Sequence, residues 1–160
     1  HNFQLSPWVI GSLCECCAAH RVPLFIWHVE ADWEKLHALA RAFPKLPLVV
    51  ETQWQKMLYH DRDLASLLDD CCNVMVESSN LIGQDFIAWI VRRWGAARIL
   101  FGSFLPVADP FASIGMILDA EISPADMALI AGGNARRLIA TMPPNMTNSP
   151  WAKLISSVAL

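Results

Sequence analysis

Four short apolar runs recur along the chain at nearly constant spacing, and this regularity limits the fold more than any other feature of the sequence. The runs begin near residues 24, 48, 74 and 98, at intervals of 24, 26 and 24 residues. Each interval holds a helical segment; in the first, Trp33, Leu36 and Ala40 share one face. Strands that alternate with helices are connected by right-handed crossovers and lie parallel in one sheet. The sequence therefore predicts an α/β fold with four parallel strands.

The boundaries of the expected elements come from capping residues, prolines and glycines. A proline directly after Ser6, Asp109 or Ser123 predicts a helix start at each of these positions, and Gly132-Gly133 predicts a break. We expect strands over 24–28, 48–52, 74–78 and 98–101, and helices over 6–20, 32–43, 61–72, 84–94, 109–120, 123–131 and 134–141. Residues 1–141 are expected to form one domain, and residues 142–160 a linker with a helical tail over 151–160.

Composition and charge exclude several classes of partner. The net charge is −3, without the basic stripe that nucleic-acid binding favours. Hydrophobic residues make up 54% of the chain and charged residues 17%, yet no apolar run approaches the roughly 18 to 20 residues of a membrane span. The excess of apolar residues therefore predicts buried strands, or a surface that another segment covers.

The five cysteines indicate a reducing compartment. Cys14, Cys16, Cys17, Cys71 and Cys72 are odd in number and lack the paired C-x-x-C spacing of zinc sites. Small, free thiols in helix ends are typical of cytoplasmic proteins. We therefore expect a cytoplasmic location.

Five segments, taken in order, resemble a known family. They are Leu24-Phe25-Ile26-Trp27-His28, Phe43-Pro44-Lys45-Leu46-Pro47-Leu48-Val49-Val50, Asn73-Val74-Met75-Val76-Glu77-Ser78-Ser79, Gly95-Ala96-Ala97-Arg98-Ile99-Leu100-Phe101-Gly102-Ser103 and Gly132-Gly133-Asn134-Ala135-Arg136-Arg137-Leu138. Together they resemble the C-terminal half of the amidohydrolase-related family, metal-dependent hydrolases and decarboxylases built on a (β/α)8 TIM barrel. The resemblance covers roughly residues 20–140.

The resemblance implies that the four strands correspond to strands five to eight of a barrel. A typical barrel needs eight strands and about 250 residues, and the chain starts at His1 instead of methionine. We therefore expect a fragment without its N-terminal half-barrel. Four strands cannot close a barrel, so the open sheet edge must be covered by the missing half, by a second copy in a homo-oligomer, or by a loop.

The resemblance also assigns roles to the residues that follow each strand. It implies that His28 is a ligand of a divalent metal such as zinc, since neutral imidazole is a common zinc ligand. By strand alternation His28 lies on the side of Ile26, which we interpret as the barrel mouth. The family has a histidine where Thr52 stands and a metal-binding or proton-accepting aspartate where Phe104 stands. Phenylalanine offers neither an oxygen ligand nor a proton acceptor.

Other polar and aromatic residues at the strand ends are candidates for substrate binding. Glu51, Thr52, Ser79 and Phe104 are expected to line the site, while the residue that performs catalysis stays unknown. Tryptophans 27, 54 and 94 stand at strand or helix ends, where indole rings line pockets or simply pack.

Two functions remain open at this point. One is an amidohydrolase-like hydrolase or decarboxylase that acts on a small carboxylate, lactone or amide, with a degraded metal site. The other is a non-catalytic homologue that binds a small molecule or a protein. A flavodoxin-like domain is disfavoured because no glycine-rich turn joins a strand to a helix.

Overall fold

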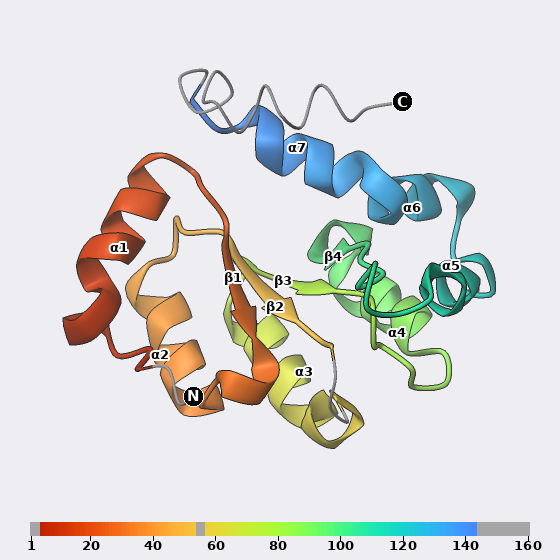
Figure 1. Ribbon diagram of the computed structural model, residues 1–160, viewed down its shortest axis with the longest axis horizontal. Coiled ribbons are helices and arrows are strands. Elements are labelled where there is room, and N and C mark those ends of the chain that lie inside the picture. Colours follow the sequence, from red (N-terminus) through yellow and green to blue (C-terminus); the bar gives the residue numbers. More distant parts are fainter. Residues whose placement is uncertain (1–3, 54–56, 144–160) are drawn as a thin grey trace.

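Four parallel strands form a single sheet in the order β1-β2-β3-β4 (Figure 1). The computed structural model describes residues 4–53 and 57–143. The strands are β1 (Leu24–Trp27), β2 (Leu48–Glu51), β3 (Val74–Glu77) and β4 (Ile99–Leu100). Their register is nearly unshifted, so that the C-terminal ends of all four strands meet at one edge. The predicted α/β class and the parallel order are confirmed.

Helices connect the strands as the sequence predicts. The α-helices are α1 (Pro7–Ala19), α2 (Trp33–Ala42), α3 (Asp61–Asp70), α4 (Phe86–Trp94), α5 (Pro110–Leu118), α6 (Pro124–Ala128) and α7 (Asn134–Ala140). Short 3₁₀ turns span His28–Glu30, Met57–His60 and Ala96–Arg98. The side chains of Asp32, Asp109 and Ser123 accept backbone N–H groups at the starts of α2, α5 and α6, at 2.9 to 3.1 Å.

Some boundaries differ from the predicted ones for identifiable reasons. β4 is only two residues long, because the N–H of Phe101 donates to the carbonyl of Ile130 instead of to a strand. α3 begins at Asp61 as predicted but ends at Asp70, two residues before the predicted end, and its N-cap is His60. The break predicted at the glycine pair is confirmed: between α6 and α7, in the segment Leu129–Gly133, the backbone of Gly132 is non-helical (φ 173°) and kinks the chain. The expected tail helix over 151–160 and Trp54 lie outside the described residues.

The two faces of the sheet are packed differently. Ile26, Val50 and Val76 belong to the large core that also contains the buried side chains of α2, α3 and α4. On the opposite face, Val49, Met75 and Leu100 form a small cluster that Leu138 of α7 joins. Phe25, on that second face, is 48% exposed. Both faces of β2, β3 and β4 are therefore covered, whereas the second face of β1 is partly open.

The sheet is open at β1. Among the described residues β1 pairs only with β2, so its other edge has no strand partner. The open sheet edge predicted from the sequence is confirmed, and what covers it stays a prediction. None of the described helices combines the length and the apolar character needed to cross a membrane.

Three polar side chains anchor the N-terminal ends of the strands. The two N–H groups of the Asn73 amide are shared among three carbonyls from the last turn of α2 to the start of β2, those of residues 40, 43 and 46, at 3.0 to 3.2 Å. The guanidinium of Arg98 donates to Val74 O at 2.6 Å and to Cys71 O at 2.7 Å. The buried amide of Asn134 donates to the carbonyls of residues 96 and 99 at 2.8 and 2.7 Å. Each group satisfies backbone carbonyls that the end of a strand or helix leaves without a partner.

Candidate functional site

A cavity of about 440 Å³ lies at the C-terminal ends of the strands. All four strands, or the residues directly after them, contribute to its wall. The lining residues are Trp27, Glu51, Gln53, Glu77, Ser79, Gly102 and Phe104. In parallel α/β sheets ligands bind at this end. The structure thus brings together three of the residues that the sequence predicts for the site, Glu51, Ser79 and Phe104.

The carboxylate of Glu77 is held in place by its neighbours. It accepts hydrogen bonds from the Ser79 N–H at 2.8 Å and from the Ser79 hydroxyl at 2.5 Å. Thr52, which is fully buried, has its backbone N–H 3.4 Å and its hydroxyl 3.3 Å from the same carboxylate. The Thr52 hydroxyl also donates to the Glu77 carbonyl at 3.0 Å and accepts the Asn80 N–H at 3.0 Å. Thr52 therefore positions Glu77 and does not line the cavity itself.

Gly102 leaves the space that this carboxylate fills. A Cβ atom at position 102 would lie 1.6 Å from Glu77 Oε1, well inside any real contact distance. The Gly102 N–H is also 3.3 Å from the Ser78 hydroxyl, which fixes the loop after β4 against β3. The glycine of the Gly102-Ser103 pair is thus required by the close approach of Glu77.

Glu51 is the less constrained of the two carboxylates. Its side chain makes no hydrogen bond or ion pair that the structure shows among the described residues, and it is half-buried. Burial raises the pKa of Glu51, and the nearby charge of Glu77 raises it further. Both effects disfavour the ionised form. Glu51 is therefore a candidate proton donor or acceptor at this site.

Phe104 contributes an aromatic wall where the resemblance implies a carboxylate. Its backbone has φ 56°, in the left-handed region that non-glycine residues seldom adopt. Its carbonyl accepts the N–H groups of Val107 at 2.9 Å and Ala108 at 3.1 Å, which closes a turn after the strand. Phe104 lines the cavity, as does Trp27, whose indole N–H donates to the Gln53 carbonyl at 2.7 Å.

His28 lies next to the cavity without lining it. Ile26 packs against the helices, so the face that we inferred for His28 is the helical face and not the barrel mouth. His28 Nδ1 is 3.0 Å from the carbonyl of Glu51, and Nε2 is buried without a hydrogen-bond partner. Since a carbonyl only accepts, Nδ1 carries the proton and Nε2 the lone pair. Burial lowers the pKa of His28 more than the Glu51 carbonyl raises it, and the charge of His60 lowers it further.

The described residues at the strand ends do not by themselves assemble a metal site. His28 Nε2 has the lone pair of a ligand, but no two further donors converge on it. In the part of the chain that the structure describes, His37, Asp70 and Cys71 are the one group of three donors that could share an ion. That group lies near the C-terminal end of α3, away from this cavity. The metal role predicted for His28 stays a prediction.

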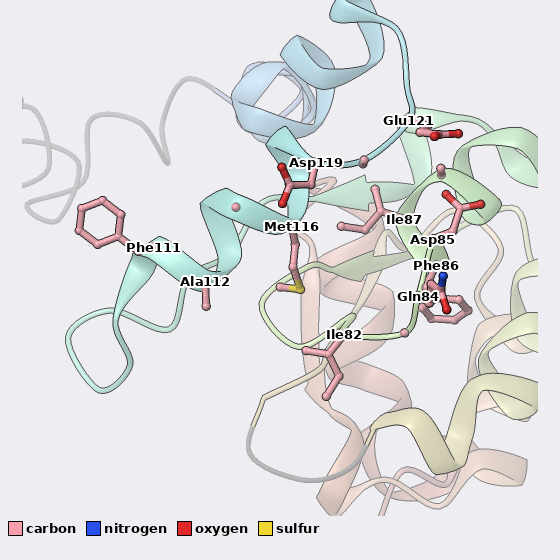
Figure 2. A pocket seen from close by; sticks show the side chains of 14 residues that line it. Ile82, Gln84, Asp85, Phe86, Ile87, Phe111, Ala112, Met116, Asp119 and Glu121 are labelled. Atoms are coloured by element: carbon pink, nitrogen blue, oxygen red, sulfur yellow. The ribbon is translucent and has the colours of Figure 1, made fainter.

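A larger cavity of about 720 Å³ lies between the start of α4 and α5 (Figure 2). Its acidic side chains are Asp85, Asp119 and Glu121. Asp85 is ion-paired with Arg92. No residue that ends a strand lines this cavity. Residues from the ends of several strands therefore do not meet here, as they do at the smaller cavity.

Sequence reasoning predicted part of the lining and missed part. Trp27 stood out as a strand-end indole, and it lines the cavity; Glu77, the last residue of β3, lines it as well. Trp94 instead packs, partly buried, against the core of the helical face, and its indole N–H donates to Asp69 at 2.9 Å. Gln53 also lines the cavity, and apart from its position next to Thr52 nothing in the sequence indicated this.

With this geometry established, comparison with known proteins assigns the family. The amidohydrolase family model matches residues 3–140. The chain belongs to the amidohydrolase family. A search of curated proteins gives no match.

Solved structures support the same fold for this amidohydrolase-family chain. An uncharacterised TIM-barrel protein from Bordetella bronchiseptica is 20% identical, with a TM-score of 0.72 over 87% of this chain and 53% of its own. An amidohydrolase 2 from Bifidobacterium longum subsp. infantis is 16% identical, with a TM-score of 0.60 over 80% of this chain and 53% of its own. A dihydroxybenzoic acid decarboxylase from Polaromonas sp. JS666, with bound manganese and the inhibitor 2-nitroresorcinol, is 16% identical, with a TM-score of 0.58 over 81% and 53%. The chain spans about half the length of these structures.

Proposed function

We propose that the strand-end cavity binds a small molecule and that this chain forms part of an amidohydrolase-like hydrolase or decarboxylase site with a degraded metal centre. The convergence of residues from all four strand ends on one cavity carries the proposal. Thr52 and Phe104, which stand where the family resemblance implies a histidine and an aspartate, support the loss of metal ligands. A threonine hydroxyl is a poor ligand for a transition metal, and a phenyl ring is none.

The charge of the cavity favours a neutral substrate. Its lining contains the carboxyl groups of Glu51 and Glu77 and, among the described residues, no cationic side chain. A small carboxylate would be repelled by these groups, whereas a lactone or an amide would not. The rings of Trp27 and Phe104 supply apolar walls for such a ligand. Of the three substrate classes implied by the resemblance, lactones and amides therefore fit best.

Glu51 is the residue to which we assign proton transfer. Its raised pKa moves the carboxyl group toward the neutral range in which a general acid or base is most effective. Glu77 is held by Ser79 and Thr52, so it shapes the cavity and disfavours the ionised form of Glu51. In this assignment Glu51 would accept a proton from the water that attacks the carbonyl carbon of the substrate.

A matched series of ligands tests this proposal. The full chain is titrated calorimetrically with dihydrocoumarin, with the lactam of the same ring, and with the ring-opened carboxylate. We expect the lactone and the lactam to bind at least several-fold more tightly than the carboxylate. Glu51→Gln should reduce this discrimination and abolish lactone opening, measured by absorbance. Glu15→Gln, an exposed carboxylate on α1, is the control. Absence of saturable binding, or no effect of Glu51→Gln, would refute the assignment.

A non-catalytic binding module is the second candidate, and Phe104 is the observation that favours it. The resemblance implies an aspartate at position 104, and a phenyl ring stands there instead. In the described part of the site, this leaves Glu51 as the one lining carboxylate that is not held by hydrogen bonds. Binding of the lactone without turnover, in the presence and absence of added zinc or manganese, would support this function and overturn the enzymatic one.

Phe104→Asp tests whether the metal centre is degraded but recoverable. Aspartate tolerates the left-handed backbone of position 104 better than most residues. Phe104→Asn is the matched control, because it has the same shape without the charge. Both variants are made with Cys71→Ser, which removes the other group of converging donors. We expect about tenfold tighter zinc or manganese binding for the aspartate variant than for the asparagine variant. Equal affinities would show that no residual metal site exists in this chain.

A further inference from the structure

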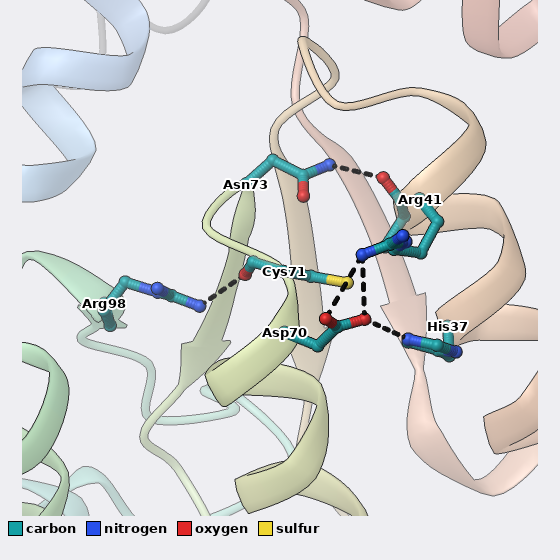
Figure 3. Close-up of polar contacts among 7 residues, drawn as sticks. His37, Arg41, Asp70, Cys71, Asn73 and Arg98 are labelled. Atoms are coloured by element: carbon teal, nitrogen blue, oxygen red, sulfur yellow. Dashed lines mark hydrogen bonds and ion pairs between the residues drawn. The ribbon is translucent and has the colours of Figure 1, made fainter.

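Three potential metal ligands converge between α2 and α3, at the end of the sheet opposite the cavity (Figure 3). They are His37 of α2, Asp70 at the end of α3 and Cys71, which caps that helix. Their ligand atoms all lie within 4.8 Å of one another. The closest pair is His37 Nε2 and Asp70 Oδ2, at 2.6 Å. An imidazole, a carboxylate and a thiol in one place form a mixed N, O and S donor set.

The backbone fixes Cys71 in this arrangement. Its N–H donates to the Leu67 carbonyl at 2.9 Å, and its carbonyl accepts the Arg98 guanidinium at 2.7 Å. The Cys71 side chain is only 3% exposed, whereas His37 and Asp70 are about half exposed. The thiol is therefore a fixed ligand position at the base of the cluster, and the other two side chains can adjust around it.

The cluster already attracts a positive group. Arg41, one turn after His37 on α2, places its guanidinium 3.2 and 3.3 Å from the two oxygens of Asp70. Its charge also acts on the Cys71 thiol. The Arg41 side chain is 61% exposed, so it can turn into solvent without losing buried contacts. The guanidinium thus occupies a place where a metal cation would meet the same carboxylate and thiol.

We propose that His37, Asp70 and Cys71 bind zinc in exchange for the Arg41 guanidinium. The ligands would be His37 Nε2, a carboxylate oxygen of Asp70 and the Cys71 thiolate. Two protons are displaced as the metal binds: the Nε2 proton that His37 now donates to Asp70 shifts to Nδ1 or passes to solvent, and the thiol proton passes to solvent. Zinc takes such donors at about 2.0 to 2.3 Å, which separates tetrahedral ligand atoms by roughly 3.3 to 3.8 Å. His37 and Asp70 need to move apart slightly and to close around the fixed sulfur of Cys71, shifts that these two half-exposed side chains allow. Water completes the fourth position.

The donor chemistry selects the metal. Calcium and magnesium prefer all-oxygen sites, so a thiolate and an imidazole exclude them as the natural occupant. The bound ion would clip α2 to α3 and stabilise the folded chain by mass action. This site is independent of the proposed function, because its donors share no residue with the strand-end cavity.

The alternative is that the cluster is only an ion pair between two helices, with Arg41 as an essential member. The two interpretations predict opposite results for Arg41→Ala. Removal of a structural partner would weaken the cluster, whereas removal of a competing cation would tighten metal binding.

Cobalt(II) serves as the spectroscopic probe, and zinc affinity is then measured by competition with a chromophoric chelator. We expect the full, reduced chain to bind one Co²⁺ with a thiolate charge-transfer band in the near ultraviolet, which zinc abolishes. His37→Ala and Cys71→Ser should each weaken zinc binding at least tenfold. Arg41→Ala should strengthen it several-fold. Because His37 is exposed, its variant tests the site even if the change at Cys71 disturbs folding.

Two control variants separate this site from other thiols and from the cavity. Cys72→Ser removes the exposed neighbouring thiol, and Glu51→Gln changes the cavity. Neither should alter the cobalt band or the zinc affinity. The proposal is overturned if the band is absent, if it depends on Cys72 instead of Cys71, or if Arg41→Ala leaves zinc affinity unchanged or lower.

Discussion

Gly102→Ala should destabilise the chain through Glu77. The new Cβ would lie 1.6 Å from Glu77 Oε1, so the carboxylate must leave its position. In leaving, it loses the hydrogen bonds from the Ser79 N–H at 2.8 Å and from the Ser79 hydroxyl at 2.5 Å. Alanine itself causes no backbone strain here, because Gly102 is not among the residues with positive φ. The whole cost therefore arises from the displaced carboxylate.

The magnitude follows from these contacts. A hydrogen bond to a charged group contributes about 1.5 to 3 kcal/mol, so two of them represent about 3 to 6 kcal/mol. Water that reaches the displaced carboxylate returns part of this amount. Alanine also lowers the entropy of the unfolded chain, which offsets about 0.4 to 1 kcal/mol. We expect a net loss of about 2 to 4 kcal/mol, a large share of the roughly 5 to 15 kcal/mol of a typical domain.

Urea unfolding followed by tryptophan fluorescence measures this loss, and a double-mutant cycle with Glu77→Ala identifies its cause. With the carboxylate removed, Gly102→Ala has nothing to displace and should be neutral or slightly stabilising. Gly115→Ala in α5, where a Cβ meets nothing within 4 Å, is the control and should stabilise the helix. If Gly102→Ala costs the same with and without Glu77, the clash is not the cause and the reasoning fails.

Three further predictions concern other groups. Asn134→Ala should cost about 2 to 3 kcal/mol in urea unfolding, because two buried carbonyls lose their donor; a loss below about 0.5 kcal/mol would contradict the role of this amide. His28 has a lowered pKa in the folded chain, so its contribution to stability is present above the ordinary histidine pKa of 6.5 and is lost as the pH falls below it; thermal unfolding of His28→Asn should show a flatter acid limb. Glu51 has a raised pKa, so its ionisation opposes folding; Glu51→Gln should stabilise the chain at neutral pH, with a gain that vanishes below the ordinary carboxyl range, and a gain independent of pH would be inconsistent with this cause.

The strands were predictable because each is a continuous apolar run, and such runs have few alternatives in an α/β chain. Val49, Met75 and Leu100 were expected in strands, and they lie there. The face that each strand presents was not predictable in the same way. Ile26 and Trp27 are both large and apolar, and only the packing of the helices decides which of them points toward the core. For this reason the side inferred for His28 was the wrong one.

The contacts show which structural role three residues of the family-like segments have. Asn73, Arg98 and Asn134 belong to the segments on which the resemblance rests, and each donates to carbonyls at the N-terminal ends of the strands. They preserve the fold and report nothing on activity. A hydrogen bond from a side chain to a distant carbonyl has no period or spacing, so sequence patterns cannot reveal it. The same holds for the contact between Glu77 and Gly102.

The two positions where the resemblance implies a histidine and an aspartate should differ in how readily they accept those residues. Thr52 is fully buried, and its hydroxyl contacts both Glu77 and the Asn80 N–H. Thr52→His would overpack this position, at about 1 to 3 kcal/mol, and leave polar groups unpaired, at about 1 to 3 kcal/mol more.

Phe104 instead lies at the edge of a cavity, so Phe104→Asp should cost only about 1 kcal/mol, the range of most tolerated changes. The free energy of unfolding in urea should therefore fall much more for Thr52→His than for Phe104→Asp, because Thr52 is packed into the hydrogen bonds around Glu77 and Phe104 is not. Equal costs at both positions would mean that Thr52 is not integral to the network, and that the family histidine could return as easily as the aspartate.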